Sequence, residues 1–77
     1  MKKATERIML ITPSKYHRTL YGTELVKRRE ALGLSQEEFA RLCGWSQPFQ
    51  SRIEAPVLHE ITKGTAEKIT KVITEYN

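Results

Sequence analysis

From residue 22 onward, apolar and polar residues alternate with the period of amphipathic helices. Leu25 and Leu32 lie two helical turns apart, which predicts a first helix over about 24–32. Gly22-Thr23 offers an N-terminal cap for this helix, and Gly33 supplies the left-handed residue that commonly follows a helix end.

The next helix carries strong local signals. Ser35 and Glu38 have the spacing of a capping box, in which each side chain accepts the other residue's backbone amide. With Gly44 as its terminator, the predicted helix covers about 36–43. Its predicted buried stripe consists of Phe39, Ala40, Leu42 and Cys43.

Ser46 is the predicted cap of a third helix over about 47–54. Its first turn tolerates Pro48, because amides there lack an intrahelical partner. The segment from Ala55 to Ile61 is predicted to be a loop, since Pro56 prevents a clean continuation of the helix.

Thr62 is the predicted cap of a last helix over about 63–75. The apolar residues at helical spacing in this segment are Ile69, Val72, Ile73 and Tyr76. The pattern therefore predicts four helices and an all-α fold.

The first 21 residues do not follow this helical pattern. Arg7 to Thr12 is rich in aliphatic residues and stops at Pro13, which suits a short strand, a turn of helix or a disordered tail. A strand here would have no partner in an all-helical domain, so it would pair with its copy in a second subunit. We divide the chain into an N-terminal extension, residues 1–21, as a candidate contact for a second copy or a partner protein, and a helical domain, residues 22–77.

The order helix, glycine turn, helix between Leu34 and Glu54 is the layout of a helix-turn-helix, whose second helix lies in the major groove of DNA. The net charge also favours a nucleic-acid partner. The chain has 13 Lys and Arg against nine Glu, which gives a net charge of +4 and a pI near 9.5. Residues 1–54 hold ten basic and six acidic side chains, whereas residues 55–77 hold three of each. An ordinary solvated basic surface is the alternative explanation of the charge alone.

The third predicted helix carries side chains that can read base edges. Gln47 suits adenine, Arg52 suits guanine, and Phe49 suits a thymine methyl group. The alternatives are core packing for Phe49 and a surface ion pair with a glutamate for Arg52. Contacts to the DNA backbone are predicted for Gln36, Ser46 and Ser51. For Gln36, a solvated residue at a helix start is the alternative.

Enzymatic chemistry finds little support. The chain has no Asp, His17 and His59 are far apart, and Cys43 lies on a predicted buried stripe, so neither a nucleophilic triad nor metal-ligand spacing can be assembled. We expect no enzyme, no cofactor and no metal. One cysteine cannot form an internal disulfide, and no apolar run suits a secretory signal or a membrane span, which predicts a cytoplasmic protein without membrane contact.

The segment from Leu34 to Ala40, the turn residue Gly44, the pair Ser46-Gln47 and the segment from Arg52 to Glu54 resemble the Cro/C1-type (XRE-like) helix-turn-helix repressors of phages and bacteria. The resemblance covers about residues 22–73. It implies a lambda-repressor-like fold, which is a small bundle of four to five helices, operator binding as a homodimer, and transcriptional control without catalysis.

By the same resemblance, Gln36 matches a phosphate-contacting glutamine, and Gln47 and Arg52 match base-reading positions. Arg29 and Glu54 match a pair that often forms a salt bridge between the first and third helices.

Two positions depart from the family pattern. Gln50 stands where the family usually buries Ile or Val, so either the helix is rotated or the amide is satisfied internally. Pro48 replaces a frequently polar reading position, which reduces the base contacts available.

The predicted function is a sequence-specific regulator of transcription that binds double-stranded DNA, a repressor reading the major groove with helix 47–54. The alternative is an antitoxin or adaptor whose main role is to bind a protein partner through Arg7 to Tyr21, with DNA binding secondary.

Overall fold

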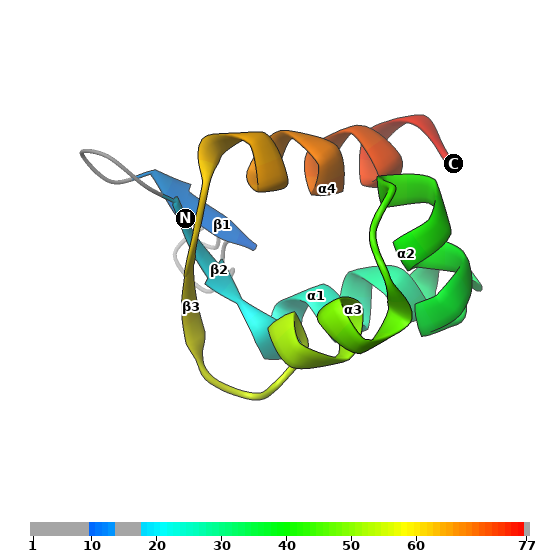
Figure 1. The fold of residues 1–77 in the computed structure, drawn as a ribbon, viewed down its shortest axis with the longest axis horizontal. Coiled ribbons are helices and arrows are strands. Elements are labelled where there is room, and N and C mark those ends of the chain that lie inside the picture. Colours follow the sequence, from blue (N-terminus) through cyan, green and yellow to red (C-terminus); the bar gives the residue numbers. More distant parts are fainter. Residues whose placement is uncertain (1–9, 14–17, 77) are drawn as a thin grey trace, which may run out of the picture.

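The computed structural model describes residues 10–13 and 18–76. Figure 1 shows a small sheet at the left end of the molecule and a helix at the right end, with α4 across the top and α1 and α3 below. The helices are α1 (Gly22–Ala31), α2 (Gln36–Cys43), α3 (Gln47–Ile53) and α4 (Lys63–Glu75). The strands are β1 (Ile11–Pro13), β2 (Arg18–Tyr21) and β3 (Leu58–Ile61).

The sheet corrects the prediction of an all-α fold. Its three strands are antiparallel in the order β1, β2, β3, with Ile11 opposite Leu20 and Arg18 opposite Ile61. The fold is mostly helical but contains this sheet as well. Strand pairing was missed because the partners of β3 lie some forty residues earlier in the chain, and local periodicity carries no signal for such pairing.

The predicted N-terminal strand is present in part, with a different partner. β1 begins at Ile11 and includes Pro13, and it pairs with β2 of the same chain rather than with a second copy. The amide of Tyr21 donates to the carbonyl of Leu10 at 2.9 Å, so the alternation of an antiparallel ladder places position 13 toward the free edge. A proline fits there, because it has no amide to donate. Residues 7–9 of the predicted strand lie outside the described residues.

β2 runs directly into α1, which begins at Gly22 rather than at about residue 24. Tyr21 occupies the N-cap position without a side-chain hydrogen bond, so the predicted Gly22-Thr23 cap is wrong. The amide of Gly22 instead donates to the carbonyl of Val57 at 3.3 Å. A Cβ atom on Gly22 would overlap the carbonyl oxygen of Ala55, so glycine allows the close approach of the two segments.

The other predicted helix boundaries agree with the structure to within a residue. Ser35 and Glu38 form the capping box of α2, and the hydroxyls of Ser46 and Thr62 cap α3 and α4. Gly33 and Gly44 have φ angles of 76° and 89°, the left-handed conformation expected after α1 and α2.

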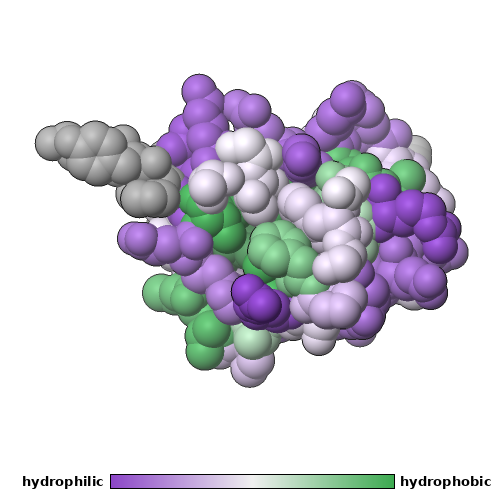
Figure 2. Space-filling view, in the orientation of Figure 1, coloured by the Kyte–Doolittle hydropathy of each residue, from purple (hydrophilic) through white to green (hydrophobic). Residues whose placement is uncertain are grey.

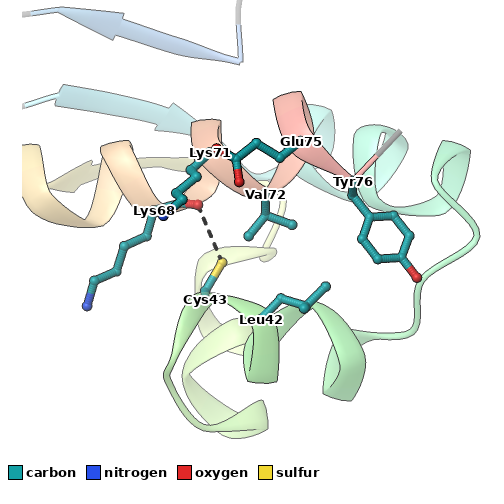
Figure 3. Close-up of a pocket in the computed structure, with 7 residues that line it drawn as sticks. All are labelled: Leu42, Cys43, Lys68, Lys71, Val72, Glu75 and Tyr76. Atoms are coloured by element: carbon teal, nitrogen blue, oxygen red, sulfur yellow. Dashed lines mark hydrogen bonds between the residues drawn. The ribbon is translucent and has the colours of Figure 1, made fainter.

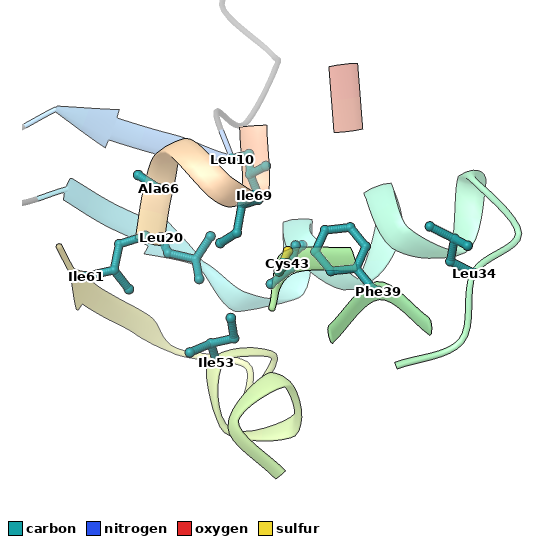
Figure 4. Packing of buried hydrophobic residues seen from close by; sticks show 10 residues of the cluster. Leu10, Leu20, Leu34, Phe39, Cys43, Ile53, Ile61, Ala66 and Ile69 are labelled. Carbon is teal, nitrogen blue, oxygen red and sulfur yellow. The ribbon is translucent and has the colours of Figure 1, made fainter. Parts of the chain in front are cut away.

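The core lies between the sheet and the helices (Figure 4). Its fully buried apolar side chains are Leu20 from β2, Leu25 from α1, Phe39 from α2 and Ile69 from α4. Two predicted core residues lie outside it: Leu42 is 50% exposed and Tyr76 is 48% exposed. Both residues lie at the far ends of their helices, where no further element covers them in the described part of the chain.

Candidate nucleic-acid interface

The turn between α2 and α3 is set by backbone hydrogen bonds. The amides of Gly44 and Trp45 both donate to the carbonyl of Ala40, at 2.8 and 3.0 Å. This closes α2, turns the chain, and brings α3 against α2. The two helices therefore form the helix-turn-helix arrangement that the sequence predicted.

The outer side of α3 is polar and open to solvent. The predicted contact residues Ser46, Gln47, Ser51 and Arg52 are all exposed, and so is Pro48. The opposite side is buried, with Gln50 at 0% and Ile53 at 3% exposure. Among the described residues, Arg52 has no ion pair or side-chain hydrogen bond, so the alternative of a glutamate partner finds no support there.

The two predicted contact glutamines touch each other. The Nε2 of Gln47 donates to the Oε1 of Gln36 at 2.7 Å. Gln36 is partly buried rather than fully solvated. The first turns of α2 and α3 are thus joined at their outer side, and both amides lie at one edge of the same surface.

A buried ion pair lies directly beneath this surface. Arg29 of α1 donates to both carboxylate oxygens of Glu54, at 2.7 and 3.0 Å, and also to the carbonyl of Leu34 at 2.8 Å. The side chains of Arg29 and Glu54 are only 11% and 3% exposed. The structure thus contains the salt bridge that the resemblance implied, and it joins α1 to the end of α3.

Glu54 accepts two further hydrogen bonds. Gln36 donates to its Oε1 and Gln50 to its Oε2, both at 2.8 Å. Burial by itself raises the pKa of the Glu54 carboxyl, but the hydrogen bonds from Arg29, Gln50 and Gln36 outweigh it and hold the pKa below its ordinary value. The carboxylate therefore stays ionised at neutral pH.

The buried amide of Gln50 is satisfied internally, which decides between the two possibilities raised by the sequence. Its Oε1 accepts from the indole Nε1 of Trp45 at 2.8 Å while its Nε2 donates to Glu54. Trp45 in turn packs edge-on against Phe49, with ring centroids 5.0 Å apart and an interplanar angle of 69°. Phe49 is partly buried and packs against the edge of the core, so the alternative of core packing for this residue holds in part.

Trp45 is a member of this hydrogen-bond network that sequence reasoning missed. A signal was available, because Trp45 and Phe49 are four residues apart and a glutamine in a buried register needs a donor. The indole N–H is a donor only, so it meets that need once α3 has formed.

The groove between the ends of α2 and α4 is a separate feature (Figure 3). It has a volume of about 460 Å³ and contains no residue of α3. Cys43 lies at its base, with Sγ 3.9 Å from the carbonyl oxygen of Lys68. Burial raises the pKa of this thiol to about 12, so it stays protonated and is a poor nucleophile.

Within residues 10–13 and 18–76, no group of three or more His, Cys, Asp or Glu side chains could hold a metal ion. Among the same residues, no helix combines the length and the apolar character needed to cross a membrane.

Comparison with known proteins agrees with this geometry. A family model described as a helix-turn-helix domain matches residues 20–68, which is more than half of the chain. Neither the curated proteins nor the solved structures contain a significant match.

Proposed function

Because the chain belongs to the helix-turn-helix domain family, we propose that it is a sequence-specific regulator of transcription, a repressor that reads the major groove of double-stranded DNA with α3. The observation that carries the proposal is the division of α3 into two sides. Gln47 and Arg52 are exposed on one side, while Gln50 and Ile53 are buried on the other. Major-groove recognition requires such an arrangement, with polar side chains free to meet base edges.

In this proposal, Gln47, Phe49 and Arg52 contact bases. Gln36 and Ser46, at the starts of α2 and α3, and the exposed Ser51 of α3 contact phosphates. Ser46 also accepts the amide of Phe49 at 3.3 Å, so its hydroxyl hydrogen is the part left for a phosphate oxygen. Arg29 and Glu54 do not touch DNA and hold α1 and α3 together.

Replacing the two exposed readers tests the proposal. Gln47→Ala and Arg52→Ala should each cost roughly 1–3 kcal/mol of binding to a selected duplex and should relax the base preference at one position. Lys68→Ala on α4 removes a charge outside the proposed interface, so it should alter neither the affinity for the selected duplex nor the base preference. Binding should weaken steeply as salt rises, because phosphate contacts release counterions. Unchanged affinity and selectivity in both reader variants would contradict the assignment.

An adaptor or antitoxin that mainly binds a protein partner is the second candidate. It is favoured by the exposed apolar side chains at the start of β3, since Val57 and Leu58 are 57% and 63% exposed. Figure 2 shows this apolar surface at the lower left, where the chain passes from α3 to β3 in Figure 1. A regulator whose main role is to bind DNA should bind its operator as the purified chain alone. An adaptor should bind DNA weakly until its protein partner is added.

A further inference from the structure

Glu54 anchors two separate arms of hydrogen bonds. The arm from Oε1 consists of Gln36 and Gln47, and the arm from Oε2 consists of Gln50, Trp45 and, by ring packing, Phe49. One arm ends at the exposed Gln47 and the other at the partly buried Phe49. The two arms share no residue except the buried carboxylate.

The direction of each amide is fixed along these arms. The indole N–H of Trp45 can only donate, and the ionised carboxylate of Glu54 can only accept. The Gln50 amide between them therefore has one orientation that satisfies both ends, with oxygen toward Trp45 and nitrogen toward Glu54. A flipped amide would place oxygen against carboxylate oxygen inside the core, where Gln50 has no access to water.

The same series of hydrogen bonds fixes the orientation of the Trp45 ring. Its N–H donates to the Oε1 of Gln50 at 2.8 Å, and its ring packs against Phe49 in a T-shaped contact with the ring centroids 5.0 Å apart. Trp45 lies immediately before the cap Ser46, so the tie reaches from the start of α3 to its end. Phe49 thereby has a defined packing partner, while the residue as a whole is only partly buried.

We propose, on the basis of the DNA-reading function above, that Trp45 and Gln50 are positioning residues that hold Phe49 in place to contact a thymine methyl group. They act independently of Gln36, which touches Gln47 of the DNA-reading surface already proposed. With its nitrogen donating to Gln36, the Gln47 amide keeps one N–H and its oxygen free, the pair of groups that matches the N7 and N6 edge of adenine. The adenine reading by Gln47 therefore serves as an internal reference for the thymine reading by Phe49.

The experiment uses a duplex selected from random DNA by the purified full chain. Each thymine is replaced in turn by uracil, which lacks the methyl group, and each adenine by 7-deazaadenine, which lacks the N7 acceptor. At the thymine that Phe49 contacts, the unaltered chain should bind the uracil duplex about fourfold more weakly, the factor that burial of one methyl group gives. At the adenine that Gln47 contacts, loss of N7 should weaken binding roughly tenfold.

The variants should separate the two readings. Trp45→Phe keeps the aromatic packing but removes the N–H. This variant and Gln50→Leu should each bind the thymine and uracil duplexes with nearly equal affinity, so that the thymine-to-uracil ratio of affinities is near one. Both variants should leave unchanged the adenine ratio, which compares affinity for the adenine and 7-deazaadenine duplexes. Gln36→Ala should do the reverse. Thr74→Ala, an exposed substitution on α4, should change neither ratio. A purely structural role would lower affinity for all duplexes and leave both ratios as they were.

Two results would overturn the inference. One is an unaltered thymine ratio in both Trp45→Phe and Gln50→Leu, and the other is a parallel fall of both ratios in these variants. Thermal unfolding of each variant is measured alongside, and if one variant is unfolded at the assay temperature the other decides. Failure of the unaltered chain to select any duplex would instead contradict the proposed function itself.

Discussion

At Glu54, one buried carboxylate accepts four hydrogen bonds from side chains that belong to α1, α2 and α3. No buried side-chain nitrogen or oxygen lacks a partner in the described part of the chain. This full satisfaction is what makes an ion pair tolerable in the interior, because charges without such partners lose more solvation than they regain.

Replacement of this carboxylate should make stability less dependent on pH. The folded pKa of Glu54 is lowered, so its contribution to stability is fully present above the ordinary carboxyl pKa and is lost as the pH falls through the folded value. Glu54→Gln should therefore cost about 3 kcal/mol or more at pH 7, where it leaves Arg29 unpaired, and less at pH 3. Urea unfolding across this pH range measures the difference.

Glu67→Gln, which removes a charge from an exposed position of α4, is the matched control and should cost little at pH 7. Parallel stability curves for the unaltered chain and Glu54→Gln would show that the carboxylate does not carry the pH dependence.

The bond between Trp45 and Gln50 should appear as a coupling energy. Trp45→Phe leaves the buried Gln50 oxygen without a donor, which should cost roughly 1–3 kcal/mol, and Gln50→Leu leaves the indole N–H unpaired. The double variant removes both partners, so its loss of stability should be smaller than the sum of the single losses. Strictly additive losses in urea unfolding would mean that this hydrogen bond contributes nothing to stability.

Single residues could be assigned from sequence only where a local rule or a family position identified them. Arg29 and Glu54 were paired by family position, and Gln50 was recognised as a departure from the family pattern. Its partner Trp45 was not found, because the contact depends on how the indole ring turns after the chain has reversed at Gly44. That orientation follows from tertiary packing and has no periodic signature.

At the level of elements, the helices were predictable, whereas β1 was predicted only in part and β2 and β3 were not predicted. The caps Ser35, Ser46 and Thr62 act within three residues of their own position, so the sequence contains the whole interaction. β2 and β3 instead depend on each other across the helices between them. β3 has no partner nearby in sequence, and β2 and β3 are each only four residues long, so alternation was too brief to indicate a sheet.

The junction between β2 and α1 gives a prediction for Gly22. Gly22→Ala should destabilise the protein by about 1–3 kcal/mol or more, because the added methyl group overlaps the backbone carbonyl of Ala55, which cannot move as a flexible side chain would. Gly64→Ala is the control: its Cβ would approach only the Thr62 hydroxyl, at 3.9 Å, so the helix former should be neutral or stabilising. Equal midpoints of thermal unfolding for the two variants would contradict this account of the junction.

At the scale of the whole molecule, the sheet and the helix-turn-helix share one core. Leu10 and Leu20 are buried in the same cluster as Phe39 and Ile53, so the described part of residues 1–21 packs on the helices. Deleting residues 1–12 would remove most of β1, and a change in assembly after that deletion would not isolate a dimer contact. The proposed homodimer is therefore better tested on the full chain and its DNA.

A homodimer that reads DNA with α3 should recognise an inverted repeat. Its half-sites should lie about one helical turn apart, roughly 34 Å from centre to centre, because each subunit places one α3 in the major groove on the same side of the duplex. Footprinting of the selected duplex, together with sedimentation of the full chain, measures the spacing and the stoichiometry. Protection of a single asymmetric site by one chain would contradict the dimer.

The buried thiol of Cys43 has a practical consequence. It is the sole cysteine of the chain and lies under α4, where it is 5% exposed. A thiol reagent can modify it rapidly only when α4 lifts away and the thiol regains its ordinary acidity, so the labelling rate reports how often that opening occurs. The rate of Cys43 labelling therefore measures local unfolding of α4 without any added probe. A slower rate on addition of a duplex would measure how strongly bound DNA suppresses this opening.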